Sequence, residues 1–164
     1  MVDDLSGLSA RQLFERTELA LRELRDRGIV RTRNAPLGDI AERIVWIARG
    51  GTLEPNSMKS HDVTTVEGAR IQVKARIMRG GNGTFSAFRS LDFTSAIFLS
   101  FDPITLDINY ARELTRDQVA SYSYRSEWVN ATTLTGAKVE VLGVDVTEEM
   151  RLAYARLDES PLPS

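Results

Sequence analysis

Residues 70–77 carry the pattern that most restricts the fold, because apolar and polar side chains alternate there without interruption. A strand directs successive side chains to opposite faces. One face of such a strand would carry the apolar residues Ile71, Val73, Ala75 and Ile77. The other would carry Arg70, Gln72, Lys74 and Arg76. The pattern therefore predicts a strand with one side in the core and a polar, mainly basic side turned outward.

Two further strands are predicted around this one. Residues 62–66 are rich in β-branched side chains and end at Glu67-Gly68, which predicts a hairpin leading into residues 70–77. Residues 93–101 form the most apolar run of the chain, which is typical of a central strand. A turn at Asp102-Pro103 then predicts a partner strand over residues 106–111.

Helical periodicity appears on both sides of these strands. Residues 9–27 predict a helix capped by Ser9 and ended by Gly28, and residues 37–49 predict a second helix closed by two glycines. Further helices are predicted from residue 114 and over residues 147–157, whereas residues 122–143 follow no clear pattern. Strands and helices mix without a βαβα repeat, so we expect an α+β, or mixed α/β, fold with a central mixed sheet flanked by helices.

The length of 164 residues predicts a single domain. Within it we distinguish a helical extension over 1–30, a core over 31–111, C-terminal helices and strands over 112–158, and a tail over 159–164. The apolar runs are too short to span a membrane. The acidic N-terminal residues lead into no apolar segment, so we expect no secretory signal and a cytoplasmic location.

Composition excludes several kinds of site. The chain has no cysteine, which rules out disulfides, thiolate metal ligands and cysteine nucleophiles. Its one histidine, His61, argues against a histidine-rich zinc site. As a single residue, His61 is open to two interpretations: a general base or phosphate contact, or a structural side chain.

The net charge of −2 conceals a division along the chain. Residues 31–90 carry ten basic and five acidic side chains, whereas residues 91–164 carry six basic and twelve acidic ones. A basic middle segment suggests a polyanion as partner. The competing interpretation is that these arginines cover an ordinary surface.

Four polar residues fall where they could form one site. Gln72 and Lys74 share the outward face of their predicted strand, and Asp62 begins the preceding strand of the hairpin. Glu42 lies off the apolar stripe of helix 37–49 and could approach the same end of the sheet. Carboxylate and amide oxygens suit Mg²⁺, and a lysine can stabilise charge on a phosphate. A polar face on an amphipathic hairpin, without any site, is the alternative.

This constellation resembles the PD-(D/E)xK nuclease superfamily, whose members share the restriction-endonuclease-like fold. The residues that carry the resemblance, in chain order, are Gly38-Asp39-x-Ala41-Glu42, Pro55-Asn56-Ser57, His61-Asp62 and Gln72-Val73-Lys74. Together with Arg33-Asn34 and the strand ending Phe101-Asp102, they are similar to those of a small bacterial family within that superfamily. The expected order of helix, strand, hairpin and strand also matches that core.

The resemblance implies a role for four of these residues. Asp62, Glu42 and Gln72 would bind Mg²⁺ or Mn²⁺, and Lys74 would join them as the catalytic lysine. Gln72 departs from the family pattern because an amide stands where an acid is usual. An amide brings no negative charge, so the departure bears directly on metal affinity.

Several residues around the motif are candidates for contacts with nucleic acid. They are Arg31, Arg33, Ser57, Lys59, Arg76, Arg79 and Arg89. We therefore expect a metal-dependent endonuclease that hydrolyses DNA. The alternatives are a protein of the same fold that binds DNA or a protein partner with little or no turnover, and a protein directed to RNA. Duplex cleavage would also be compatible with a homodimer.

Overall fold

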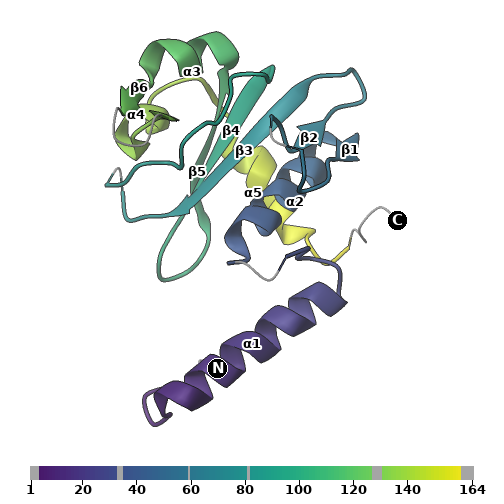
Figure 1. Ribbon diagram of the computed structural model, residues 1–164, viewed down its shortest axis with the longest axis vertical. Helices are drawn as coiled ribbons and strands as arrows, with labels where there is room; N and C mark the ends of the chain where they lie inside the picture. The colour runs from purple at the N-terminus through teal and green to yellow at the C-terminus, as the bar shows by residue number, and fades with distance from the viewer. Residues whose placement is uncertain (1–3, 33–34, 59, 81, 127–130, 160–164) are drawn as a thin grey trace.

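The computed structural model describes residues 4–32, 35–58, 60–80, 82–126 and 131–159. Its centre is a six-stranded mixed sheet in the order β1-β2-β3-β4-β5-β8 (Figure 1). The strands are β1 (Thr52–Leu53), β2 (Val63–Thr64), β3 (Arg70–Ile77), β4 (Ser95–Phe101), β5 (Ile108–Thr115) and β8 (Val144–Asp145). Strands β3 and β4 are parallel, and the other neighbours are antiparallel. The expected α+β class with a mixed central sheet is confirmed.

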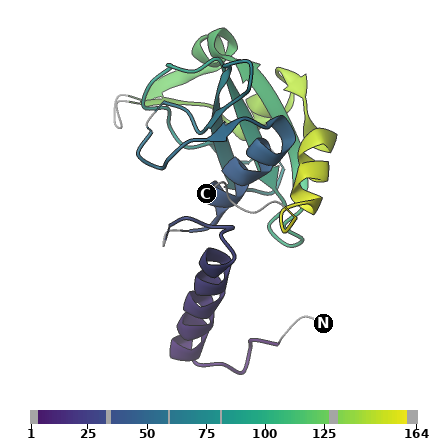
Figure 2. The same cartoon turned by 90° about the vertical axis from the view of Figure 1, so that its right-hand side faces the viewer.

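Helices cover both faces of the sheet (Figures 1 and 2). Helices α2 (Leu37–Arg49) and α5 (Thr147–Ala155) pack on one face. The other face is covered by α3 (Arg116–Tyr122), α4 (Gly136–Glu140) and the irregular residues 85–93. A small second sheet pairs β6 (Tyr124–Ser126) with β7 (Ala131–Thr133).

Strand β4 is the centre of this arrangement, as its apolar sequence predicts. All seven of its residues are buried. Ile97 and Leu99 contribute to the core under α2 and α5, while Ala96 and Phe98 contribute to the core on the opposite face. A strand buried on both faces needs apolar side chains at consecutive positions, which explains the uninterrupted run.

The hairpin that leads into β3 is also confirmed. Val63 pairs with Ile71, and Gly68 in the turn has a φ of 89°, a conformation that favours glycine. Ile71 and Val73 are buried as expected, but Ile77 at the end of the strand is 43% exposed. The alternating pattern thus gives the face correctly for most of the strand.

The C-terminal region belongs to the same core as the preceding residues. Strand β5 runs across the expected boundary between 111 and 112, and α5 packs beside α2. The segment 122–143, which follows no clear sequence pattern, contains β6, β7 and α4. Beyond Glu159, the expected tail lies outside the described residues.

Helix α1 (Ala10–Asp26) has the expected position in the sequence but stands apart from the sheet (Figures 1 and 2). Ser9 caps it through a capping box with Gln12, and Gly28 follows its end with a φ of 69°. None of its residues is buried. Within the described part of the chain, no helix is both long and apolar enough to cross a membrane.

Candidate functional site

Asp62 lies at the start of β2, where its side chain completes the hydrogen bonding of the neighbouring strand. The Oδ2 atom accepts a hydrogen bond of 2.7 Å from the backbone N–H of Val73 and one of 2.8 Å from Nε2 of Gln72. Strand β2 has only two residues, so β3 extends past its partner at this point. The carboxylate takes the place of the missing strand for one N–H group, which fixes its orientation.

Glu42 projects from α2 into the same region. Its Oε2 atom lies 2.6 Å from Nη2 of Arg31, and the same guanidinium donates through Nη1 to the carbonyl of Glu54 at 2.7 Å. The side chains of Arg31 and Glu42 are each 19% exposed, so this ion pair is largely shielded from water. Arg31 therefore ties the segment before α2 to the end of β1.

Asp39 fixes the same connecting segment. Its Oδ2 atom accepts hydrogen bonds from the backbone N–H groups of Arg31 and Thr32, and from the Thr32 hydroxyl. Asp39 lies in the first turn of α2, where a negative charge is favourable. The structure adds that this buried carboxylate holds the backbone from which Arg31 reaches Glu42.

Lys74 is held in place by the segment that follows β3. Its Nζ donates to the carbonyl of Ala87 at 3.0 Å and lies 4.9 Å from the ring centroid of Phe88. Both contacts come from the irregular segment between β3 and β4. An aromatic face attracts an ammonium group, so Phe88 favours the charged lysine in this position.

Two adjoining pockets meet at these residues. One of about 300 Å³ is lined by Arg31, Glu42, Glu54, Asn56 and Asp62, among others. The second, of about 270 Å³, is lined by Asn56, Ser57, Met58, Gln72, Lys74, Ala87 and Arg89. Asn56 belongs to both pockets. The four residues singled out from the sequence are therefore brought together, with Glu42 and Asp62 in one pocket and Gln72 and Lys74 in the other.

The pKa values of three ionisable residues in this site are shifted, by burial first and by neighbouring charges second. Burial raises the pKa of Glu42 to about 7; the Asp62 charge adds to the rise, while Arg31 opposes it. Burial also raises the pKa of Asp62, against the Val73 hydrogen bond and the charge of Lys74. Burial lowers the pKa of Lys74, against the charge of Asp62. Two acids and one base are thus all held in environments that disfavour their charged forms.

The donor set fits a hard cation in part. Within the described residues, no group donates a hydrogen bond to Oδ1 of Asp62 or to Oε1 of Glu42, and both side chains line the same pocket. Mg²⁺ is commonly held by one or two carboxylates, with water and phosphate completing its shell. Among the described residues, however, no group of three or more His, Asp or Glu side chains is arranged to hold a metal ion.

Gln72 is oriented as a donor in this structure. Its Nε2 faces Asp62, so the amide oxygen is turned away from the carboxylate that it would have to join around a metal ion. The two ends of an amide are assigned from hydrogen bonding, and donation to a carboxylate requires the nitrogen end. Gln72 could bind a cation only after this amide turned over.

His61 has a structural position. It is 7% exposed, and its ring nitrogens lie 2.8 Å from Ser60 Oγ and 3.0 Å from Thr64 Oγ1. Thr64 in turn donates to Glu54 Oε1 at 2.7 Å. This chain of contacts holds β1 and β2 together beside Asp62, and His61 lines neither pocket.

Glu54 is a site residue that no sequence pattern indicated, and Asn56, part of the Pro55-Asn56-Ser57 motif, had no role assigned to it. Both line the pocket of Glu42 and Asp62. The backbone N–H of Glu54 donates to the carbonyl of Asp62, because β1 pairs with β2 in antiparallel register. Glu54 could have been recognised as a site residue only from its position opposite Asp62, and that position follows from the strand register.

The candidates for nucleic-acid contacts are distributed unevenly. Ser57 and Arg89 line the pocket of Lys74, whereas Arg31 forms an ion pair with Glu42. Arg76 follows Lys74 on the same face of β3 and donates to the carbonyl of Thr84. Arg79 is exposed after the end of β3. Arg33 and Lys59 lie outside the described residues.

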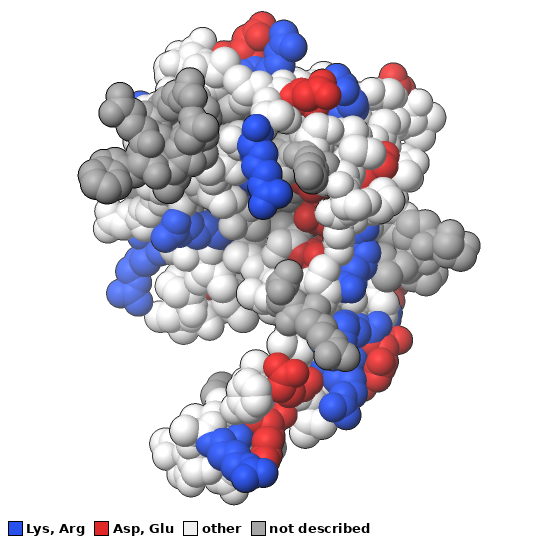
Figure 3. Space-filling model, in the orientation of Figure 1, with Lys and Arg blue, Asp and Glu red and all other residues white. Residues whose placement is uncertain are grey.

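The face seen in Figure 3 shows no continuous basic patch. Lys and Arg side chains are scattered there, and several stand beside Asp or Glu. The excess of basic residues in segment 31–90 is therefore not gathered into one area on this face.

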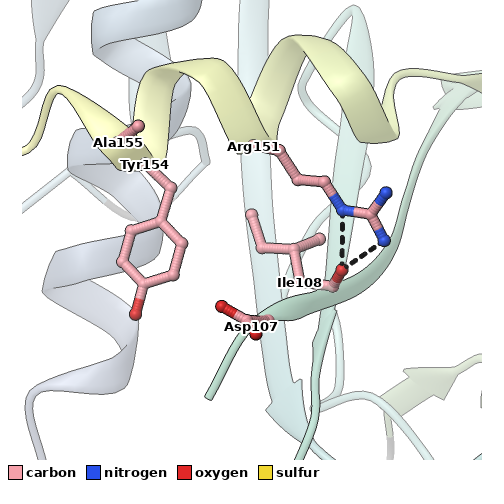
Figure 4. Close-up of a pocket in the computed structure, with 5 residues that line it drawn as sticks. All are labelled: Asp107, Ile108, Arg151, Tyr154 and Ala155. Carbon is pink, nitrogen blue, oxygen red and sulfur yellow. Dashed lines mark hydrogen bonds between the residues drawn. The ribbon is translucent and has the colours of Figure 1, made fainter. Parts of the chain in front are cut away.

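A larger pocket, of about 490 Å³, lies elsewhere, between α5 and the start of β5 (Figure 4). Arg151 Nε and Nη2 donate to the carbonyl of Ile108 at 3.0 and 2.8 Å. Tyr154 stacks edge-on against Phe101. Arg151 is thus engaged in holding β5 to α5, and none of the residues singled out from the sequence lines this pocket.

Comparison of the chain with known protein families and with curated proteins finds no match.

Proposed function

We propose that the chain is a metal-dependent nuclease that hydrolyses DNA phosphodiester bonds, with a core of the restriction-endonuclease-like type. The observation that carries this proposal is the meeting of Glu42, Asp62 and Lys74 at two adjoining pockets. These residues come from α2, the start of β2 and β3. The order of α2, β1, the β2–β3 hairpin and β4 supports the same proposal, because it is the order that the resemblance implies.

Hydrolysis joins a water oxygen to phosphorus, breaks one P–O ester bond and releases a proton. Lys74, in the second pocket, would stabilise the negative charge that develops on the phosphate oxygens. Burial raises the pKa of Glu42 to about 7 without a metal ion, so binding of a cation near neutral pH would displace a proton from this carboxyl. Asp62, oriented by Val73 and Gln72, would bind a Mg²⁺ or Mn²⁺ ion together with Glu42. Such an ion, when bound, supplies Lewis-acid activation of water and phosphate.

Cleavage of supercoiled plasmid with Mg²⁺ or Mn²⁺ tests this proposal. We expect Asp62→Asn and Lys74→Met to lower the rate by about 100-fold or more, as for loss of a group that stabilises transition-state charge. Asp107→Asn and Lys138→Met are matched controls, since both residues are exposed and neither lines the two pockets. Equal cleavage by the site variants and the controls would overturn the proposal.

Substrate choice is a separate arm of the experiment. Single-stranded RNA and duplex DNA are offered together at one stated salt concentration, because phosphate contacts weaken as salt rises. Preferential loss of duplex DNA supports the proposal as stated. Preferential loss of RNA would replace DNA with RNA as the substrate.

A second candidate function is a binding module of the same fold with little or no turnover. The orientation of Gln72 favours it, because its amide nitrogen rather than an acidic oxygen faces Asp62. Arg31 also supplies Glu42 with a positive charge without any metal ion. Calorimetry discriminates the two: no heat with Mg²⁺ or Mn²⁺, together with retained DNA binding, selects the module. Metal binding that Asp62→Asn abolishes selects the nuclease.

A further inference from the structure

Helix α1 presents an apolar stripe that the rest of the described chain does not cover. Its core positions are Leu13, Thr17, Ala20 and Leu24, spaced four, three and four residues apart, with Phe14 and Leu21 beside them. This spacing places them on one side of a helix. Leu13 is 37% exposed and Phe14 is 66% exposed, and no residue of the helix is buried.

A helix of this length does not draw its stability from its own hydrogen bonds alone. Isolated helices shorter than about 12–15 residues are marginal in water, and in proteins most helical stability comes from packing of an apolar face rather than from the helix alone. Helix α1 has 17 residues and well-formed caps at both ends, yet it packs little of its stripe. The geometry therefore calls for a covering partner.

We propose that this partner is the α1 helix of a second copy of the chain, paired in antiparallel orientation. Antiparallel pairing that sets Leu13 opposite the partner copy's Leu24 also sets Thr17 opposite Ala20, and Phe14 and the partner copy's Leu21 then flank this seam on one side. In the same register Arg16 and the partner copy's Glu23 flank the seam on its other side, and this neighbouring pair occurs twice, once at each end of the symmetric pair. The stripe and its flanking charges are thus complementary to themselves.

The charges distinguish this occupant from others. Parallel pairing would set Arg16 beside Leu21, so neither Arg16 nor Glu23 would gain an opposite charge from the partner copy, and Glu23 would keep only Arg27 of its own chain, 2.8 Å away. In the described part of the chain, Arg16 makes no ion pair or hydrogen bond, so it is available to a second copy.

The overall charge of α1 also disfavours an anionic surface as the occupant. The helix carries four arginines and four acids, namely Arg11, Arg16, Arg22 and Arg25 with Glu15, Glu18, Glu23 and Asp26. Helices that lie on anionic membranes or nucleic acid carry an excess of basic residues. The inference rests on α1 alone and is independent of the proposed function.

Sedimentation of the full-length protein over a range of concentrations tests the pairing. The wild type is expected to form dimers, and Arg16→Glu or Glu23→Arg to raise the dissociation constant about tenfold, since each turns two attractive pairs into repulsive ones. The double variant, and an equimolar mixture of the two single variants, restore opposite charges and are expected to dimerise like the wild type. Arg22→Glu, on the opposite side of the helix, is the matched control.

Disulfide trapping tests the orientation, and the natural chain has no cysteine to interfere. A mixture of Leu13→Cys and Leu24→Cys proteins is expected to cross-link, whereas Leu13→Cys alone is not. Cross-linking of Leu13→Cys with itself would overturn the antiparallel register. A wild type that stays monomeric at hundreds of micromolar, or that binds anionic vesicles instead of itself, would overturn the pairing altogether.

Discussion

The guanidinium of Arg31 lies 2.6 Å from the carboxylate of Glu42 and compensates its negative charge. Glu42 is surrounded by protein and feels the charge of Asp62 as well. Arg31 is itself held through the carbonyl of Glu54, so the compensation is built into the fold rather than formed by a loose surface pair. The ionisation of Glu42 should therefore report on the state of the whole site.

The free energy of unfolding should fall as the pH rises from about 4.5 to about 7, owing to Glu42. The pKa of its carboxyl is raised from 4.5 to about 7, so in this window the native state keeps a proton that the unfolded chain releases. The contribution is complete below pH 4.5 and lost above pH 7, amounting to at most about 3 kcal/mol. Denaturant unfolding of wild type and Glu42→Gln at pH 5 and pH 8 measures it.

In that measurement, the wild type should lose stability relative to Glu42→Gln between the two pH values. Glu18→Gln, on the exposed helix α1, is the control and should track the wild type. A constant difference between wild type and Glu42→Gln at both pH values would contradict the assigned shift.

Replacement of Arg31 by methionine should raise the pKa of Glu42 beyond about 7. Arg31 opposes the effects of burial and of Asp62, through both its charge and its hydrogen bond. Removal also leaves the Glu54 carbonyl without this donor, which should cost about 1–3 kcal/mol of stability. Titration of the glutamate side chains by ¹³C NMR checks the direction. Arg156→Met, which removes an exposed ion pair, should leave the Glu42 titration unchanged.

Lys74 should lose its proton at a lower pH than the ordinary value of 10.5. Burial lowers its pKa, and Arg89 adds to the effect, while Asp62 and Glu42 oppose it. The chain contains three lysines, Lys59, Lys74 and Lys138, so ¹³C-labelled dimethyl-lysine gives a spectrum simple enough to assign. The signal that Lys74→Arg removes should be the one with the depressed titration. The assignment fails if that signal titrates at or above 10.5.

Local sequence patterns were sufficient for much of the fold. Alternation in β3 and continuous apolarity in β4 identified a hairpin and a central strand, because each pattern depends on neighbouring residues only. Contacts between distant segments were not accessible in this way. Arg49 on α2 binds Glu113 on β5 and Glu149 on α5, and nothing in its local sequence indicates either partner.

The same distinction between local patterns and distant contacts applies to the candidate site. Asp62, Gln72 and Lys74 could be grouped from the sequence because they belong to one hairpin. Glu54 belongs to the site only because β1 pairs with β2. Lys74 is held by a hydrogen bond to the carbonyl of Ala87, which lies in an irregular segment. The orientation of the Gln72 amide is decided by a hydrogen bond to Asp62, which residue type alone does not specify.

Gly51 should be the glycine at which a methyl group does most harm to the site. It has a φ of 81°, and a Cβ there would lie 2.0 Å from the carbonyl oxygen of Thr64 and 2.8 Å from the Cα of Thr65. Both obstacles are backbone atoms of the strand that follows Asp62, so β1 and β2 would have to separate. Gly51→Ala is therefore expected to destabilise the protein by more than about 1 kcal/mol and to loosen the contacts of Glu54 with Arg31.

Gly38 provides the matched comparison, since it lies within α2 and a Cβ added there meets no atom within 4 Å. Gly38→Ala should stabilise the protein by about 0.5–1 kcal/mol, because alanine loses less backbone entropy in a helix. Thermal and denaturant unfolding of both variants gives the two signs. If Gly51→Ala were as stable as the wild type, β1 could not be packed against β2 as described, and the position of Glu54 beside Asp62 would have to be revised.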